Sequence, residues 1–310
     1  MTCRAVKVRQ LTIAASLRIL AAMSVKIPAS ALLLFILTLC APGIMPLGAQ
    51  QHSWEFPGYE NAMRGSGREI GAVDEGSFLS AQKRKQKYID EIKAMLFRNF
   101  SYADPVVIKA FEEVPREYFM YNYESGSNMG QSAYEVPARE WKIGYGSVLT
   151  DYMMQAYMTA KAKPRPADVS LEIGTGSGFQ SALLSRIVKK AYTIEIITSL
   201  GDKVKNIFAP LGSENIEARV GDGFFGWPEV EGGFDIILVT AQAPFVPPAL
   251  LSQLKKGGRM IIPIGQPWKP QFLYTFTKDA QGKVHSQRDV STLFIPMTGQ
   301  IQTPPPRPSR

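Results

Sequence analysis

Cysteine is nearly absent from this chain of 310 residues, and the two that occur, Cys3 and Cys40, both lie near its beginning. Disulfide bonds, thiol catalysis and zinc sites built on thiolates are therefore excluded from everything after residue 40. Histidine is almost as rare, with only His52 and His285. We expect both to be incidental, so the chain lacks the residues for an ordinary nucleophile and general-base pair.

Acidic residues are missing from residues 1–50, which contain five basic ones. Subtracting these five charges from the net charge of +8 leaves +3, so the body is close to neutral and no nucleic-acid partner is expected. After Lys26 an uncharged apolar run continues to the small residues of "LGAQ". This layout predicts a secretory signal peptide and a periplasmic or extracellular protein. Two alternatives stay open: a retained membrane anchor, or a cytoplasmic protein whose start is misassigned.

The remainder divides into three parts. Residues 51–77 are polar and rich in glycine, which predicts a linker or loosely ordered arm. Residues 78–300 form the expected domain, and the Pro-rich residues 301–310 are expected to be disordered. Apolar residues at helical spacing predict a helix over 78–100, and Asp104 before Pro105 predicts the N-cap of another.

From residue 168 onward, short apolar segments alternate with helical ones. The expected helices follow Gly178 and Thr198 and span 246–254, and the expected strands are "VSLEI", "AYTIEI", "NIEARV", "FDIILV" and "GRMIIPI". Such alternation predicts an α/β fold with a doubly wound, mostly parallel sheet, preceded by a helical extension. The segments "QFLYTFTKD" and "VSTLFIPM", on either side of "DAQGK", predict a closing C-terminal β hairpin.

Three alternating glycines, Gly174, Gly176 and Gly178, follow the first of these strands, and Glu172 precedes them. Ligands bind at the carboxyl ends of strands in such sheets, and glycine lets the backbone approach them closely. A dinucleotide fingerprint needs a glycine at position 179, which is Phe179, so an NAD-dependent oxidoreductase is disfavoured. A phosphate loop needs a lysine that is also missing, and the acid at Glu172 suits a cationic ligand better than a pyrophosphate.

Further acids follow the next two strands. Glu195 ends the second strand, at the offset where a carboxylate accepts hydrogen bonds from ribose hydroxyls. Asp222, followed by Gly223, comes after the third strand, where a carboxylate can accept the amino group of adenine. The ordered set predicts S-adenosylmethionine, which combines a cationic sulfonium, a ribose and an adenine without phosphate. The expected fold is thus a Rossmann-like class I methyltransferase.

Longer stretches carry a family resemblance. "LEIGTGSGFQSALLS", "VGDGFFGWPE", "FDIILVTAQAPFVPPALLSQLKKGGRMIIPIG" and "FIPMTG" resemble the protein-L-isoaspartate O-methyltransferase family, and "VPREYFM" and "IGYG" agree with it. The similarity spans roughly Tyr88 to Gly299. The resemblance implies a metal-free repair enzyme that methylates the free α-carboxylate of isoaspartyl residues in damaged proteins. Such an acceptor is ionised at neutral pH and needs no general base.

The acceptor loop departs from the family pattern. Where the family reads G-Q-T-I-S-Q-P, this chain has "GSVLTDY". Thr150 keeps the hydroxyl of the family's serine, so the resemblance assigns it the catalytic, substrate-side role. Asp151 replaces a glutamine and places a negative charge beside a site meant for a carboxylate, unless it serves as the cap of a helix starting at Tyr152. A different acceptor, or a non-catalytic binding module with this fold, therefore stays open.

Overall fold

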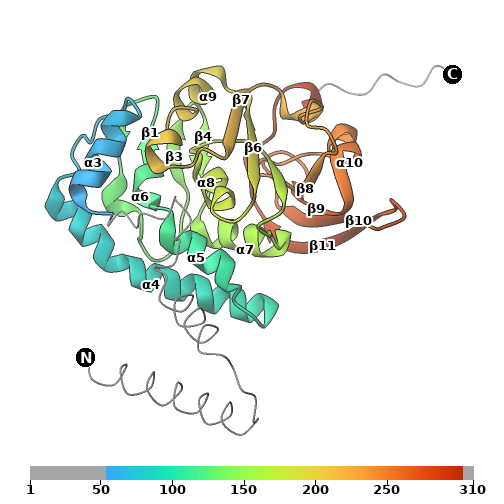
Figure 1. Cartoon of the computed structure of the whole chain (residues 1–310), viewed down its shortest axis with the longest axis horizontal. Coiled ribbons are helices and arrows are strands. Elements are labelled where there is room, and N and C mark those ends of the chain that lie inside the picture. The colour runs from blue at the N-terminus through green and yellow to red at the C-terminus, as the bar shows by residue number, and fades with distance from the viewer. Residues whose placement is uncertain (1–53, 303–310) are drawn as a thin grey trace, which may run out of the picture. The chain divides into compact units, whose positions relative to one another are not determined.

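The computed structural model describes residues 54–302 of the chain (Figure 1). The leader expected over residues 1–50 and most of the tail expected over 301–310 lie outside the described residues. Within the described part, no helix is both long enough and apolar enough to cross a membrane.

A seven-stranded sheet forms the centre of the described part, with the strand order β11-β10-β9-β8-β5-β6-β7 (Figure 1). The five strands from β5 to β9 pair in parallel, and β10 and β11 add to one edge in antiparallel fashion. The expected α/β class and all five expected parallel strands are confirmed. Their bounds are β5 Val169–Ile173, β6 Lys190–Glu195, β7 Ile216–Val220, β8 Phe234–Val239, β9 Leu254–Ile264, β10 Gln271–Lys278 and β11 Val284–Thr292.

Both faces of this sheet are buried, as the apolar strand sequences require. Along β8, Ile236 and Leu238 belong to one buried cluster, whereas Ile237 and Val239 belong to a second cluster on the other face. The first cluster receives side chains from α7 (Tyr152–Ala162), α8 (Phe179–Ser185) and α9 (Thr198–Val204). The second receives Leu250 of α10 (Pro248–Gln253). The expected helices are thereby confirmed.

The N-terminal extension packs on the first cluster. It consists of α3 (Phe56–Gly65), α4 (Glu75–Phe100), α5 (Pro105–Glu113), α6 (Arg116–Phe119), a short β1-β2 pair (Tyr121–Asn122 and Ser127–Asn128) and the 3-10 turn η1 (Gly130–Ser132). Asp104 accepts a hydrogen bond from the backbone N–H of Val106 at 2.9 Å, so its predicted capping role is confirmed.

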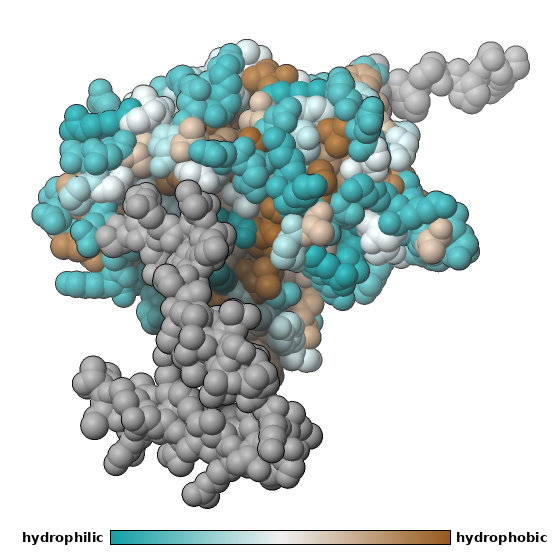
Figure 2. Space-filling view, viewed as in Figure 1, coloured by the Kyte–Doolittle hydropathy of each residue, from teal (hydrophilic) through white to brown (hydrophobic). Residues whose placement is uncertain are grey.

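The face shown in Figure 2 is mostly hydrophilic, with hydrophobic residues gathered near its centre.

Helix α3 corrects the expectation of a loosely ordered arm over residues 51–77. Tyr59 and Met63 of this helix are fully buried, and the Tyr59 ring lies 5.3 Å from the ring of Phe78 in α4. This helix could not be predicted from the sequence, because glycines near both ends and few apolar residues leave no sustained helical periodicity. Burial of two large side chains against α4 compensates for that weak local preference.

The C-terminal hairpin also differs from its expected bounds. Strand β11 occupies Val284–Thr292, whereas the expected strand "VSTLFIPM" covers residues 290–297. The polar residues of β11 form an exposed sheet edge, which needs no apolar alternation. Residues 293–298 instead leave the hairpin and follow the end of β8: Gln242 donates its backbone N–H to the carbonyl of Ile295, and Met297 donates to that of Gln242, both at 2.8 Å.

Candidate active site

A cavity of about 880 Å³ opens where β5, β6 and β8 end. Strand β5 lies between β6 and β8: the chain runs from β5 through β6 to β7 and then returns to β8 on the other side of β5. This reversal of strand order creates the crevice in which such sheets bind ligands. The lining comes from the glycine loop after β5, the ends of β6 and β8, residues 293–298, the start of α7 and the hairpin of β3 (Trp141–Gly144) and β4 (Ser147–Leu149).

The three predicted glycines have different tasks. All have positive φ, at 98° for Gly174, 54° for Gly176 and 84° for Gly178. A Cβ atom would lie 2.8 Å from Thr240 Oγ1 at Gly174 and 2.8 Å from Ile207 Cδ1 at Gly178, whereas at Gly176 the nearest atom is 3.8 Å away. Gly174 and Gly176 line the cavity, but Gly178 is the N-cap of α8 and lies outside the lining. Gly176 is thus where the backbone is open to a ligand.

Glu172 lies in β5 just before this loop and is 1% exposed, yet it belongs to the cavity lining. Its Oε2 accepts hydrogen bonds from the hydroxyls of Ser181 and, at 2.9 Å, Thr193. Burial raises the pKa of the Glu172 carboxyl to about 8 despite these two donors. A cationic ligand group at this wall would favour the ionised form.

Glu195 ends β6, lines the same cavity and is 5% exposed. Its Oε2 accepts the backbone N–H of Gly176 at 2.9 Å, and its Oε1 accepts that of Ile197 at 3.0 Å. Burial raises the pKa of this carboxyl as well. Glu195 therefore meets the glycine loop, as its position at the end of the second parallel strand predicts.

Asp222 lies beside the cavity. Its Oδ1 accepts the backbone N–H of Phe224 at 2.9 Å within the turn η3 (Gly223–Phe225), and its Oδ2 accepts that of Gln300 at 2.7 Å, next to η4 (Gln300–Gln302). Gly223 lines the cavity, whereas Asp222 does not. The carboxylate thus joins the end of β7 to the C-terminal segment, and its contact with adenine stays a prediction.

Thr150 and Asp151 lie immediately before α7, on a different segment of the cavity lining from the glycine loop. Both line the cavity. The Asp151 carboxylate accepts the backbone N–H of Met154 at 2.9 Å, which confirms its interpretation as the cap of α7. Asp151 also lines the cavity, so one carboxylate both caps α7 and places a negative charge at the expected acceptor side.

Several residues of the cavity lining were not predicted from the sequence. Gln155, Gln180 and Gln242 contribute amides, and Trp268 and Leu293 contribute large side chains that are 74% and 68% exposed. The glutamines are isolated polar residues in apolar helices or loops, and only the folded chain shows that they converge. "QPWKPQ" was the available signal for Trp268, since an aromatic residue between prolines indicates a rigid loop.

The lining of the cavity contains acidic residues and no basic ones. Four carboxylic residues contribute to it, and no lysine, arginine or histidine does; the four are Glu140, Asp151, Glu172 and Glu195. Such a wall opposes a phosphate ligand and fits the cationic, phosphate-free S-adenosylmethionine. Across residues 54–302, no group of three or more His, Cys, Asp or Glu side chains is placed to hold a metal ion.

The chain is similar to known proteins in both its sequence and its fold. A family model described as protein-L-isoaspartate(D-aspartate) O-methyltransferase matches residues 83–302. Protein-L-isoaspartate O-methyltransferase 2 of Syntrophobacter fumaroxidans is 36% identical over 235 residues, which cover 76% of this chain and 92% of the relative. Protein-L-isoaspartate O-methyltransferase 1 of Nitrosospira multiformis is 46% identical over 157 residues, 51% of this chain and 66% of the relative. A solved protein-L-isoaspartate O-methyltransferase structure matches with a TM-score of 0.59 at 26% identity, covering 70% of this chain and 67% of the other.

Proposed function

The chain belongs to the protein-L-isoaspartate(D-aspartate) O-methyltransferase family, and we infer that it methylates the free α-carboxylate of isoaspartyl residues in damaged proteins. One observation carries this inference. A single cavity is lined both by the glycine loop with Glu172 and Glu195 and by Thr150 and Asp151. A donor held by the first group of residues and an acceptor held by the second would therefore meet within one cavity.

The donor wall fits S-adenosylmethionine, which supplies a methyl group activated by its sulfonium charge. Gly176 lets the backbone approach the ligand, because no side chain stands between them. We assign Glu195 to the ribose hydroxyls and Glu172 to the cationic amino-acid end. Gly174 and Gly223 complete this wall.

The acceptor wall has a simpler task. An α-carboxylate has a pKa of about 3.5 and is already a nucleophile at neutral pH, so no proton is removed when its oxygen is methylated. We assign Thr150 the role of donating its hydroxyl to the acceptor carboxylate, which fixes the attacking oxygen in line with the methyl group.

Methyl transfer from labelled S-adenosylmethionine to matched isoaspartyl and aspartyl peptides tests this function in the full chain. Selective labelling of the isoaspartyl peptide is the expected result. Labelling of neither peptide by a protein that binds the donor would point to another acceptor. Absence of donor binding would instead support a non-catalytic binding module.

We also propose that residues 1–50 direct the protein out of the cytoplasm. The uncharged apolar run after Lys26 and the small residues that end it support this proposal. Fractionation of cells that express the full chain, with N-terminal sequencing of the product, is the test. A shortened chain outside the cytoplasm is expected; a full-length chain in the membrane would indicate an anchor, and a cytoplasmic chain a misassigned start.

A further inference from the structure

Arg116 lies directly behind the acceptor wall and is only 1% exposed. Its Nη2 donates to the carbonyl oxygen of Thr150 at 2.9 Å, and its Nη1 donates to Oε1 of Gln155 at 2.7 Å. Both recipients are uncharged and both line the cavity. A buried cation thus supports the loop that carries the proposed acceptor contact.

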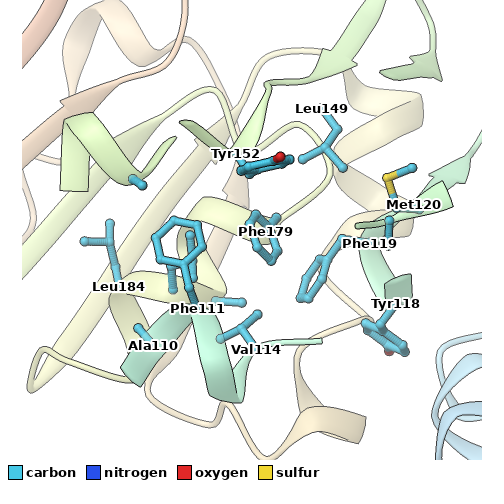
Figure 3. Close-up of a cluster of buried hydrophobic side chains, with 14 of the residues drawn as sticks. Ala110, Phe111, Val114, Tyr118, Phe119, Met120, Leu149, Tyr152, Phe179 and Leu184 are labelled. Atoms are coloured by element: carbon cyan, nitrogen blue, oxygen red, sulfur yellow. The ribbon is translucent and has the colours of Figure 1, made fainter. Parts of the chain in front are cut away.

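Two aromatic rings hold the guanidinium of Arg116 in this position. Its central carbon lies 4.9 Å from the ring centre of Phe179 and 5.7 Å from that of Tyr152. Figure 3 shows both rings within the same buried cluster, one from the start of α8 and one from the start of α7. Ring faces attract a cation electrostatically and restrict where it can move.

The charge of Arg116 has no direct carboxylate partner in the part of the chain described. None of the ion pairs between residues 54 and 302 includes it. Burial lowers the pKa of the Arg116 guanidinium, while neighbouring Tyr88 and Asp151 oppose this effect. Arginine nevertheless stays charged in proteins, and burying an unpaired charge is costly. This unpaired positive charge acts electrostatically on the groups around it, which a neutral side chain at the same position would not do.

The acidic composition of the cavity lining explains why a positive charge is useful at this position. Its lining contains four carboxylic residues and no basic one, yet the acceptor of the proposed reaction is an anion. Asp151 in particular would repel a carboxylate held at Thr150. Arg116, bonded to Thr150 just before Asp151 and to Gln155 four residues after it, is placed to offset this repulsion.

We propose that Arg116 is a positioning residue that makes the acceptor side of the cavity receptive to a carboxylate. It holds Thr150 and Gln155 in place through its two hydrogen bonds and balances the charge of Asp151. This inference rests on the proposed methylation of a carboxylate. It assigns the acceptor specificity of the altered loop to a charge from outside that loop.

The test compares Arg116→Gln with a matched control, Arg68→Gln, in the full chain. Arg68 is also buried, at 5% exposure, donates to the carbonyl of Tyr118 and stacks on its ring at 4.0 Å, but Tyr118, unlike Thr150 and Gln155, does not line the cavity. We expect Arg116→Gln to raise KM for the isoaspartyl peptide about tenfold, while Kd for S-adenosylmethionine changes less than about twofold. The control should leave the ratio of these two constants unchanged.

A second substitution separates charge from shape. Adding Asp151→Asn to Arg116→Gln removes the repelling charge and keeps a good helix cap, so KM for the peptide should return toward that of the unaltered protein. No recovery, an unchanged peptide KM in Arg116→Gln, or equal losses for peptide and donor would each overturn the proposal. If Arg116→Gln fails to fold, Arg116→Lys keeps the charge but not both hydrogen bonds, and an equal loss of affinity for peptide and donor in that variant would overturn the proposal. An unaltered protein that methylates no isoaspartyl peptide would refute the proposed function instead.

Discussion

The backbone N–H of Gly176 donates to Oε2 of Glu195 over 2.9 Å, so the glycine loop after β5 is tied to the end of β6. The other oxygen of the same carboxylate accepts the N–H of Ile197. One side chain therefore connects the two strand ends that form the proposed donor wall. Its loss should disturb the ligand site in two ways, by removing a ligand contact and by releasing the loop.

Glu195→Ala should weaken binding of S-adenosylmethionine by at least about tenfold, because hydrogen bonds to charged groups contribute about 1.5–3 kcal/mol. Glu195→Gln should lose less, since its amide oxygen can still accept the N–H of Gly176. Titration calorimetry measures both affinities. Glu217→Ala on the exposed side of β7 is the control, and donor affinity in Glu195→Ala equal to that of the control would reject the assignment.

Gly176→Ala and Gly178→Ala should fail in different ways. Both positions have positive φ, which costs a residue with a Cβ about 1–2 kcal/mol. At Gly178 the new Cβ would also meet Ile207 and Phe208 within 3.0 Å, so about 1–3 kcal/mol of further destabilisation is expected in urea unfolding. At Gly176 the chain should fold and lose donor affinity, because the Cβ would occupy space open to the cavity. The reverse pattern would show that Gly178, not Gly176, faces the donor.

Glu172 should make the stability of the protein depend on pH. Burial raises the pKa of its carboxyl from 4.5 to about 8, so the folded state holds a proton that the unfolded state has released over this interval. The free energy of unfolding should therefore fall as pH rises from about 4.5 to about 8 and level off above that range. Urea unfolding of Glu172→Gln across this range should show a flatter profile than the unaltered protein; parallel profiles would contradict the raised pKa.

Asp222→Ala should reduce both stability and donor affinity. It removes the acceptor of two backbone N–H groups, those of Phe224 and Gln300, at a cost of about 1–2 kcal/mol. The segments thereby released include Gly223 and Met297, which line the cavity. Thermal unfolding and calorimetry together are the measurement. A lower melting temperature with unchanged donor affinity would confine Asp222 to a structural role and withdraw its predicted contact with adenine.

Local patterns in the sequence were sufficient for much of the fold. The parallel strands could be identified from their short apolar runs, because a strand buried on both faces needs apolar residues at successive positions. The caps at Asp104 and Asp151 could be identified because a helix N-cap bonds to a backbone N–H only two or three residues away. The glycines with Glu172 and Glu195 indicated the donor wall, since parallel strands end at one edge of the sheet.

Contacts between distant residues decided the rest. Helix α3 exists because Tyr59 and Met63 are buried against the rest of the extension, and residues 293–298 reach the cavity because they bond to Gln242. Nothing in the sequence distinguishes the arginine of "VPREYFM" from an ordinary surface charge. Only the fold places Arg116 behind Thr150 and Gln155. The sequence by itself indicated which segments form strands and which glycine loop follows the first of them, because apolar runs and turn residues are recognisable over a few neighbouring positions. Only the tertiary structure decided the charge balance of the acceptor side, because burial and long-range packing set it.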